Sequence, residues 1–206
     1  MASLFKGNAS NTALPLLHAL MKTLSVKTAL EFGAGIVSSP FFAKKTHRLV
    51  SIETNKKWLE KASKLCKGYG SREFIHQYHD PSDPGALLRH KFTCMTKINE
   101  HGPFDLIYVD QAVDLRTPTI ETVIGLSNII VFHDSEDAAY NYHQIKNSTF
   151  WGRYVRWSFR SFPVWTDALV VQKWADRFDK VSRAAAKFAE CKVANGPYTH
   201  EMLIIE

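Results

Sequence analysis

The sequence has few cysteines and no long hydrophobic run. Its three cysteines, Cys66, Cys94 and Cys191, are far apart and odd in number, so they fit neither a disulfide framework nor a zinc site. No apolar run approaches the roughly 20 residues that a membrane span needs. The first residues, MASLFKGNASNT, also lack the hydrophobic segment and the cleavage site of a secretory signal. The sequence therefore predicts a cytoplasmic protein without a membrane partner.

The sequence also lacks a dense basic tract, although its formal net charge is +6. A basic balance is compatible with nucleic-acid binding. The basic residues, however, are spread over several segments, so solvated helix faces are the favoured interpretation and nucleic-acid binding is the less favoured alternative. The segments that support this interpretation hold Lys44, Lys45 and Arg48; Lys56 and Lys57; and Arg153, Arg156 and Arg160.

Length and composition fit one globular domain. A chain of 206 residues can enclose a three-layer core, and 45% hydrophobic with 22% charged residues is ordinary for such a protein. The chain has no repeat, no low-complexity tract and no long linker. We therefore expect a single domain over residues 1–206, with an N-terminal cap helix within 1–25 and a helical extension over 175–206.

Residues 28–60 have the pattern of one mononucleotide-binding βαβ unit. An apolar run over 29–32 enters a turn that contains Gly33 and Gly35. Because glycine has no Cβ, the backbone can bend sharply here and come close to a ligand. The Ser-Ser-Pro sequence at 38–40 suits the first turn of a helix, since hydroxyl groups cap free N–H groups and proline needs no partner there.

Two glutamates flank this unit where a nucleotide would bind. Glu53 ends the second apolar run, about 20 residues after the turn, where an acid can accept hydrogen bonds from ribose hydroxyls. Glu31 precedes the turn, and Ser38 stands where a dinucleotide fold favours a third glycine. A carboxylate at this place would repel a pyrophosphate and attract a cationic amino-acid group. S-adenosylmethionine (AdoMet), which has an ammonium, a sulfonium and no phosphate, fits best; the alternative is a turn whose glycines only relieve strain.

This acid-x-Gly-x-Gly pattern with a later acid resembles motif I and the strand-two acid of class I AdoMet-dependent methyltransferases. The resemblance implies that AdoMet binds at these residues. An indole one turn after the second acid could cover the adenine, and Tyr78, His79 and Asp80 are further candidates for adenine contact. Asn8 and Asn11 could touch the ligand from the N-terminal segment. The main candidates for cofactor binding are Glu31, Gly33, Gly35, Ser38, Ser39, Glu53, Trp58 and Asp110.

Two further apolar runs, FDLIYVD and NIIVFHD, end in Asp110 and in His133-Asp134. In open α/β sheets the ligand crevice lies outside the carboxyl ends of the strands. We therefore expect these residues to meet the two glutamates at one rim. Each acid could instead cap a helix, and this alternative is strongest for Asp134.

These two runs resemble the strand-four and strand-five signatures of catechol-type small-molecule O-methyltransferases, over roughly residues 25–140. The resemblance implies methyl transfer to a hydroxyl of a small molecule or glycan, with Asp110, His133 and Asp134 as catalytic candidates. His133 or Asp110 could be the general base, and an unperturbed histidine has a useful pKa near ~6.5.

Metal-dependent members of that family hold one magnesium ion with the strand-four acid and an Asp-Asn pair. Here the pair reads Asp134-Ser135, so the asparagine is missing. Two carboxylates and water could still bind a hard cation such as Mg²⁺, which makes Asp110 and Asp134 the candidate metal ligands. Rim acids that never meet a metal are the alternative.

Strand-like and helical segments alternate along the chain, which predicts an α/β fold. We expect a Rossmann-like, mostly parallel seven-stranded sheet with helices on both faces and an antiparallel closing strand. The last residues, MLIIE, suit either a further strand or a packed tail. The expected strands are 28–32, 48–53, 74–78, 104–109, 128–132, 154–159 and 168–172, and the helices are 11–24, 55–67, 84–99 and 175–190.

Cofactor motifs do not identify a methyl acceptor, so other functions stay open. An enzyme that cleaves AdoMet is one alternative and an RNA methyltransferase is another, although Asp110 and Lys146 do not have the spacing of a ribose-methylating set. DNA amine methylation would need an Asn/Asp-Pro-Pro-aromatic motif, which is missing. A non-enzymatic nucleotide-binding module should have lost the rim acids. The sequence does not indicate an oligomeric state.

Overall fold

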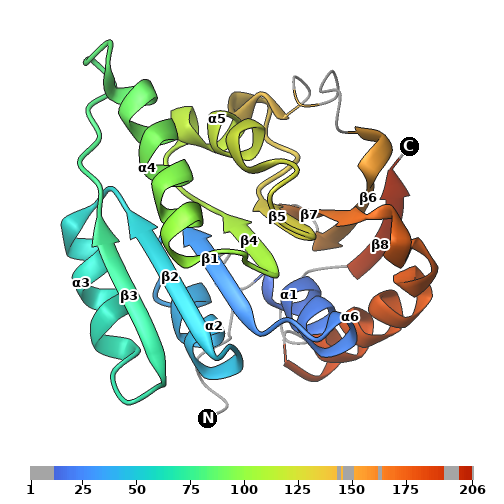
Figure 1. Cartoon of the computed structure of the whole chain (residues 1–206). Coiled ribbons are helices and arrows are strands. Elements are labelled where there is room, and N and C mark those ends of the chain that lie inside the picture. The colour runs from blue at the N-terminus through green and yellow to red at the C-terminus, as the bar shows by residue number, and fades with distance from the viewer. Residues whose placement is uncertain (1–11, 143–144, 146–150, 162–163, 193–199, 206) are drawn as a thin grey trace.

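The computed structural model describes residues 12–142, 145, 151–161, 164–192 and 200–205. Within these residues the chain forms an eight-stranded sheet with the order β3-β2-β1-β4-β5-β7-β6-β8 (Figure 1). None of the described helices combines the length and apolar composition needed to span a bilayer.

The elements follow one another with short connections. The strands are β1 (Thr28–Phe32), β2 (Arg48–Glu53), β3 (Ser71–His76), β4 (Leu106–Val109), β5 (Ile129–His133), β6 (Tyr154–Ser161), β7 (Val164–Val171) and β8 (His200–Ile205). The α-helices are α1 (Leu14–Leu24), α2 (Ser38–Lys45), α3 (Lys56–Leu65), α4 (Ala86–His101), α5 (Val113–Val123) and α6 (Phe178–Lys192). Short 3₁₀-helices are η2 (Ala138–Tyr140), η4 (Trp151–Arg153) and η5 (Gln172–Arg177).

Five neighbouring strands of the sheet are parallel. β1 pairs with β2 and β4, and β3 and β5 extend the parallel part on either side. Parallel neighbours need crossover connections, which α2, α3, α4 and α5 provide. β7 pairs antiparallel with β5, β6 with β7, and β8 with β6. The carboxyl ends of the five parallel strands therefore share one edge of the sheet.

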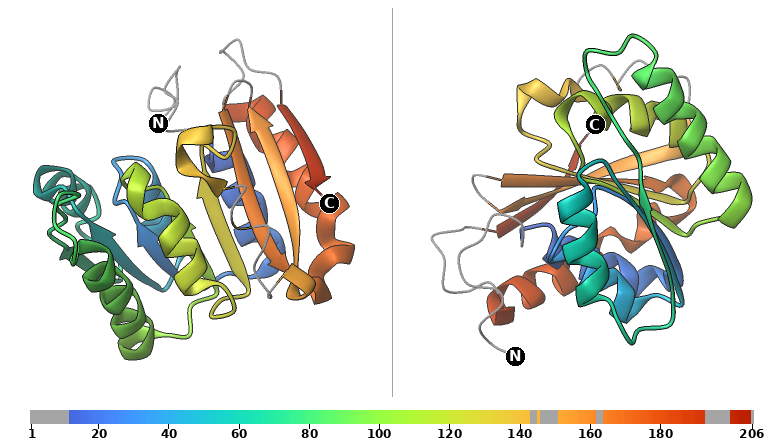
Figure 2. Two further views of the ribbon diagram at one scale, coloured as in Figure 1. Left: turned by 90° about the horizontal axis from the view of Figure 1, so that it is seen from above. Right: turned by 90° about the vertical axis from the view of Figure 1, so that its left-hand side faces the viewer.

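Helices cover both faces of the sheet (Figure 2). One face is covered by α1, α2, α3 and α6, and its core includes Leu16, Phe42 and Val181. The other face is covered by α4 and α5, with Ile98 and Ile120 in its core. Strands between two helical layers are buried on both sides and therefore need continuous apolar runs.

β1 illustrates why the sequence forms this layer structure. Ala29 packs into the core on the α1 side, whereas Leu30 and Phe32 pack into the core on the α4 and α5 side. All three are 0% exposed. Full burial of such a Leu or Phe side chain stabilises a fold by about 1.5–3 kcal/mol, so a strand with apolar residues on both faces is stable only inside this sandwich.

The predicted fold class is confirmed, and the sheet has one strand more than the seven predicted. Residues 200–205 form β8, which pairs with β6 in the register Phe159↔Met202. Within the extension predicted over 175–206, the described residues form helix up to Lys192 and an edge strand over 200–205. The apolar MLII run, which suits a strand as well as a tail, finds an open sheet edge to pair with.

Candidate functional site

The carboxyl ends of β1, β2, β4 and β5 form a rim that carries most of the predicted site residues. The turn after β1 lies directly against the end of β4, because Gly33 N donates to Ile52 O (2.8 Å) and Asp110 N donates to Phe32 O (2.8 Å). Gly33 has φ +96°, and a Cβ on it would fall 1.9 Å from the Asp110 carbonyl oxygen. Only glycine fits here, so the glycine turn joins the β1–β2 and β4–β5 halves of the rim.

Glu31 lies beneath this turn and is fully buried. Its Oε2 accepts hydrogen bonds from Ser39 Oγ and Ser51 Oγ, both at 2.6 Å, and Ser39 Oγ also accepts from Gly35 N at 3.0 Å. Its Oε1 has no hydrogen-bond partner among the described residues. Burial raises the pKa of Glu31 to about 7, and the nearby hydroxyl groups of Ser38, Ser39 and Ser51 offset only part of that effect. A buried carboxylate with one free oxygen is a natural partner for a cationic group.

Glu53 is the last residue of β2 and lies close to Ala34 in the glycine turn. It is 8% exposed, and its Oε1 accepts from Asn55 N at 2.7 Å and from Thr54 Oγ1 at 3.3 Å. Burial raises its pKa, while these hydrogen bonds oppose the rise. The carboxylate keeps acceptor capacity for hydroxyl donors, as the ribose prediction requires.

Trp58 lies in the first turn of α3, whose N-terminus is capped by the Asn55 side chain. The indole is 43% exposed, so it does not pack into the sheet, and Lys61 Nζ lies 5.1 Å from its ring centroid. Its ring is therefore accessible from the solvent beside the β2 end of the rim.

At the ends of β4 and β5, Asp110, His133 and Asp134 come together, with one ligand atom of each within 4.8 Å of the others. His133 Nδ1 lies 3.1 Å from Asp134 Oδ1 and 3.7 Å from Asp110 Oδ1. The other ring nitrogen, Nε2, lies 2.8 Å from Thr12 Oγ1, in the segment before α1. Both ring nitrogens are therefore engaged. Asn8 and Asn11, in the same N-terminal segment, lie outside the described residues.

The charges of this cluster shift its pKa values strongly. Burial alone would lower the pKa of His133, but Asp110 and then Asp134 outweigh burial and raise it to about 9. Burial alone would raise the pKa of Asp134, but His133 and Arg116 lower it to about 2. For Asp110, His133 and Arg116 likewise outweigh burial and lower the pKa. At neutral pH the imidazole is therefore protonated and both carboxyl groups are ionised.

Arg116 of α5, which the sequence reasoning missed, holds this cluster together. Its Nη2 lies 2.8 Å from Asp110 Oδ1 and its Nη1 lies 3.0 Å from Asp134 Oδ2. Nη1 also donates to His133 O at 2.9 Å, and Nε donates to Gln111 O at 2.7 Å. The Arg116 side chain is 8% exposed. A signal was present in the sequence, because an arginine shares the buried stripe of α5 with Ile120 and Val123, at helical spacing.

The predicted metal ligands Asp110 and Asp134 lie together with His133, and the magnesium site stays a prediction. Asp110 and Asp134 are close enough to share an ion, but each already bonds to the Arg116 guanidinium, and His133 adds a second positive charge. A magnesium ion would have to displace the guanidinium or lie beside it. A hard cation would therefore compete with Arg116 for the two carboxylates.

The loop after β3 separates the three candidates for adenine contact. Tyr78 is 74% exposed, and His79 Nε2 lies 2.5 Å from Asp114 Oδ2 of α5. Asp80 accepts hydrogen bonds from the Ser82 backbone and side chain. None of the three contacts the glycine turn in a described hydrogen bond.

A buried polar cluster behind this loop was also missed. His90 of α4 is 0% exposed; its Nδ1 lies 3.2 Å from Gln77 Oε1 and its Nε2 lies 2.6 Å from Thr119 Oγ1. Gln111 donates to the same Thr119 hydroxyl and to Leu115 O. The cluster ties the loops after β3 and β4 to α4 and α5, and so fixes the rim on that side. Its sequence signal was a histidine on the buried stripe of α4.

Neither a protein-family model nor a curated protein matches this sequence. Solved structures do match its fold. An rRNA methylase from Streptococcus thermophilus aligns with a TM-score of 0.53 and 12% identity, over 75% of this chain and 94% of that chain. The N-methyltransferase NodS from Bradyrhizobium japonicum WM9 aligns with a TM-score of 0.53 and 12% identity, over 79% and 95%. A ribosomal protein L11 methylase from Lactobacillus delbrueckii subsp. bulgaricus aligns with a TM-score of 0.53 and 11% identity, over 78% and 79%.

At these identities the likeness shows the fold alone. The chain has the Rossmann-like methyltransferase fold, with a mostly parallel sheet that is closed by antiparallel strands. The finer resemblance to catechol-type O-methyltransferases stays a prediction.

Proposed function

We propose that this protein is an AdoMet-dependent methyltransferase. The observation that carries the proposal is the buried Glu31 carboxylate beneath the Gly33 turn, which has one oxygen without a described partner and a pKa raised to about 7. Burying a carboxylate is costly unless a cation accompanies it. The ammonium of AdoMet would supply that cation. A dinucleotide, which presents a pyrophosphate at such a turn, would be repelled.

The other predicted cofactor residues have consistent roles in this proposal. Glu53 would accept hydrogen bonds from the ribose hydroxyls. Ser39 links Glu31 to the Gly35 amide. A Cβ on Gly35 would lie only 2.8 Å from Ser38 Oγ. These serines fix the conformation of the glycine turn. The exposed Trp58 ring would cover the adenine.

AdoMet supplies a methyl group on a sulfonium, and we propose that a hydroxyl receives it. The acceptor proton would pass to the Asp110 carboxylate. His133 is the less suitable base, because its pKa is raised to about 9 and both of its nitrogens are engaged. Arg116, His133 and Asp134 would instead hold Asp110 in position. Since a low pKa makes aspartate a weak base, most of the rate would come from orientation of the acceptor.

We propose a reaction without a metal ion, because the Arg116 guanidinium already bonds to one oxygen of each carboxylate. The small-molecule and glycan acceptors expected from the sequence are supported only by the catechol-type resemblance. The excess of lysines over residues 44–67 supports RNA as the acceptor instead.

Calorimetric titration of the purified protein with AdoMet, S-adenosylhomocysteine and NAD tests the proposal. We expect AdoMet and S-adenosylhomocysteine to bind and NAD to bind more weakly. Glu53→Ala should weaken AdoMet binding by about 1.5–3 kcal/mol, the range for hydrogen bonds to a charged group. Glu60→Ala, which removes an exposed acid from α3, is the matched control and should leave affinity unchanged.

Two results would contradict the proposal. Tighter binding of NAD than of AdoMet would overturn the ligand. Consumption of AdoMet without an acceptor, with products other than S-adenosylhomocysteine, would replace the methyltransferase by an AdoMet-cleaving enzyme.

A further inference from the structure

The positive charge of the chain is concentrated in one segment. Residues 44–67 contain eight lysines and arginines and two glutamates, a net charge of +6. The whole chain has 26 basic and 20 acidic residues, which is also +6. The remaining residues therefore sum to zero. The basic residues that look dispersed in the sequence thus include a local excess equal to the entire net charge.

The fold places most of this excess on the exposed sides of two neighbouring helices, although Lys45 also lies near His18 of α1. α2 packs against α3, and the lysines at the end of α2, along α3 and just after it are all exposed. None of them forms an ion pair with a described residue. We call this surface the α2–α3 lysine face; it consists of Lys44, Lys45, Lys56, Lys57, Lys61, Lys64 and Lys67.

This arrangement is locally unfavourable. Lys56 and Lys57 lie in the first turn of α3, which has no acidic residue, although the positive end of a helix dipole favours acids. Lys57 and Lys61 are four residues apart on the helix, where like charges repel. Glu60, four residues from both Lys56 and Lys64, offsets part of this charge. The remaining excess, on an otherwise regular element, points to a partner that supplies the opposite charge.

We propose that the α2–α3 lysine face binds the phosphate backbone of RNA. Lysines neutralise phosphates as point charges, and several of them in a row give strong, sequence-independent attraction. One exposed aromatic side chain that the cofactor proposal does not use lies beside the lysines: Tyr69, just after α3, is 40% exposed. Aromatic rings beside a basic surface stack on unpaired bases.

A membrane surface fits this face less well. An interfacial helix inserts its apolar side into the bilayer. The apolar side of α3 is occupied, because Leu59 and Ala62 are buried against Ala34 and Phe74 inside the protein. The outward side of α3 is mainly charged, which suits a polyanion in water.

The position of the face connects it to the rim. α3 follows the end of β2, where Glu53 lies, and only β1 separates β2 from β4. Neighbouring strands are about 4.8 Å apart, so Asp110 lies about 10 Å across the sheet from that end. An RNA strand bound along α3 would therefore pass close to the rim. The inference that RNA is the methyl acceptor rests on the proposed methyl transfer. The inference that the lysine face binds RNA does not depend on it.

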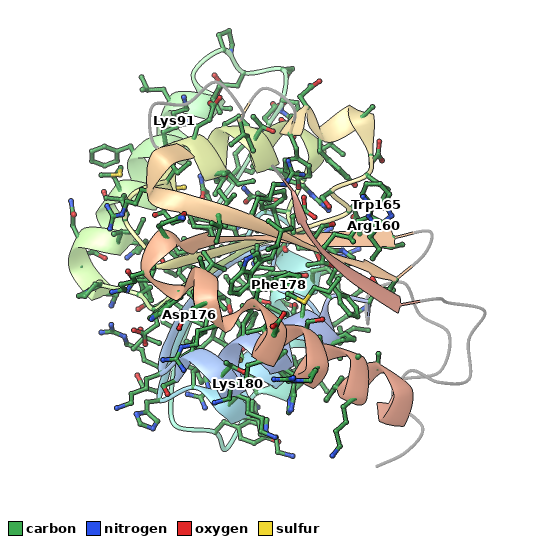
Figure 3. All side chains as sticks on the ribbon, turned by 90° about the vertical axis from the view of Figure 1, so that its right-hand side faces the viewer. Lys91, Arg160, Trp165, Asp176, Phe178 and Lys180 are labelled. Carbon is green, nitrogen blue, oxygen red and sulfur yellow. The ribbon has the colours of Figure 1, made fainter. Side chains whose placement is uncertain are left out.

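Two charge-reversed variants with the same net charge test the inference. The first carries Lys57→Glu, Lys61→Glu and Lys64→Glu on α3. The second carries Lys180→Glu, Arg183→Glu and Lys187→Glu, three exposed basic residues of α6. α6 lies at the opposite end of the sheet from α3 (Figure 1), and Lys180 is labelled on it in Figure 3. Circular dichroism verifies that both variants fold.

Fluorescence anisotropy with a short, fluorescein-labelled, single-stranded RNA of mixed sequence gives the affinities. We expect the α3 variant to lose at least about tenfold in affinity, and the α6 variant to change by less than about threefold. The slope of log affinity against log salt should fall by about 2 in the α3 variant, since three phosphate contacts contribute about 0.7 each.

The inference is overturned if the wild-type protein does not bind the RNA, or if both variants weaken binding equally, which would show a bulk charge effect. It is also overturned if the α3 lysines are needed for binding to phosphatidylserine vesicles and not to RNA. AdoMet calorimetry on the α3 variant separates the two proposals. If the wild-type protein binds RNA but not AdoMet, the proposed methyltransferase function is wrong and the RNA surface stands. If it binds AdoMet but not RNA, the RNA surface is wrong and the methyltransferase function stands.

Discussion

The two halves of the rim hold carboxylates in opposite electrostatic surroundings. At the ends of β1 and β2, Glu31 is fully buried and forms no ion pair with a described residue, and burial raises its pKa to about 7. At the ends of β4 and β5, Asp110 and Asp134 share the Arg116 guanidinium and the protonated His133. There the cations outweigh burial, and the pKa of Asp134 falls to about 2.

This difference indicates that the β1–β2 half binds a cationic ligand, whereas the β4–β5 half needs no added charge. In the β4–β5 half, Arg116 and His133 balance the charges of Asp110 and Asp134, so this half needs no ligand for neutrality. The β1–β2 half has a buried acid that only an added cation or a proton can neutralise. The comparison therefore indicates that a cationic ligand gains most from binding at the β1–β2 half, and three variants test it.

The largest effect is expected from Gly33→Ala, because this turn joins the two halves. An alanine would have to adopt φ +96° and would place its Cβ 1.9 Å from the Asp110 carbonyl oxygen. Backbone strain and overpacking each cost about 1–3 kcal/mol. We expect a loss of about 5 kcal/mol in the free energy of unfolding, measured by urea denaturation, or failure to fold.

Gly68→Ala is the matched control for this loss. Gly68 also has a positive φ, +87°, but nothing lies within 4 Å of the place that an alanine Cβ would take. It should lose only about 1–2 kcal/mol, the cost of the left-handed conformation. Equal losses in the two variants would show that the contact with Asp110 is unimportant.

Arg116→Met should have the next largest effect, because it makes the β4–β5 half resemble the β1–β2 half. Breaking a buried charge pair costs about 3–5 kcal/mol. We expect about 3 kcal/mol, since the Asp110 and Asp134 side chains stay 27% and 24% exposed. Urea denaturation at pH 7 measures the loss.

Arg116→Lys is the control for charge alone. A lysine keeps the charge but cannot reach both carboxylates with a rigid fork, so an intermediate loss is expected. If Arg116→Met is as stable as the wild type, the two carboxylates do not need the guanidinium and the comparison fails.

Glu31→Gln should have the smallest effect, and one that depends on pH. The folded pKa of Glu31, about 7, lies above the ordinary glutamate pKa of 4.5. Protonated Glu31 therefore stabilises the fold fully below pH 4.5, and this contribution is lost as pH rises through 7. At about 1.4 kcal/mol per pKa unit, the wild type should lose about 2.5 kcal/mol between pH 5 and pH 8, relative to the variant.

Urea denaturation of both proteins across this pH range measures the difference, with Glu60→Gln as an exposed control. Saturating AdoMet should stabilise the wild type more at pH 8 than at pH 5, because its ammonium would pair with the ionised Glu31. A difference between wild type and variant that does not change with pH would contradict the assignment of a buried, unpaired acid.

Local patterns predicted the β1–β2 half of the rim from sequence. The apolar run, the glycine turn and the acid after the next strand occur within 26 residues, between Thr28 and Glu53, and each reports on backbone geometry near itself. Chain order also predicted the approach of Asp110, His133 and Asp134 to that turn, since parallel strands end at one edge.

The sequence therefore determined the layers of the fold and the acids at the rim, because periodicity and turn chemistry are local properties. Tertiary structure alone decided what neutralises each acid. The rotation of α5 against the sheet directs Arg116 toward Asp110 and Asp134, and no spacing in the chain fixes that rotation. Tertiary structure also decided that the lysines of residues 44–67 lie together on an outer surface, because a sequence gives the count of charges while packing determines which side chains face water.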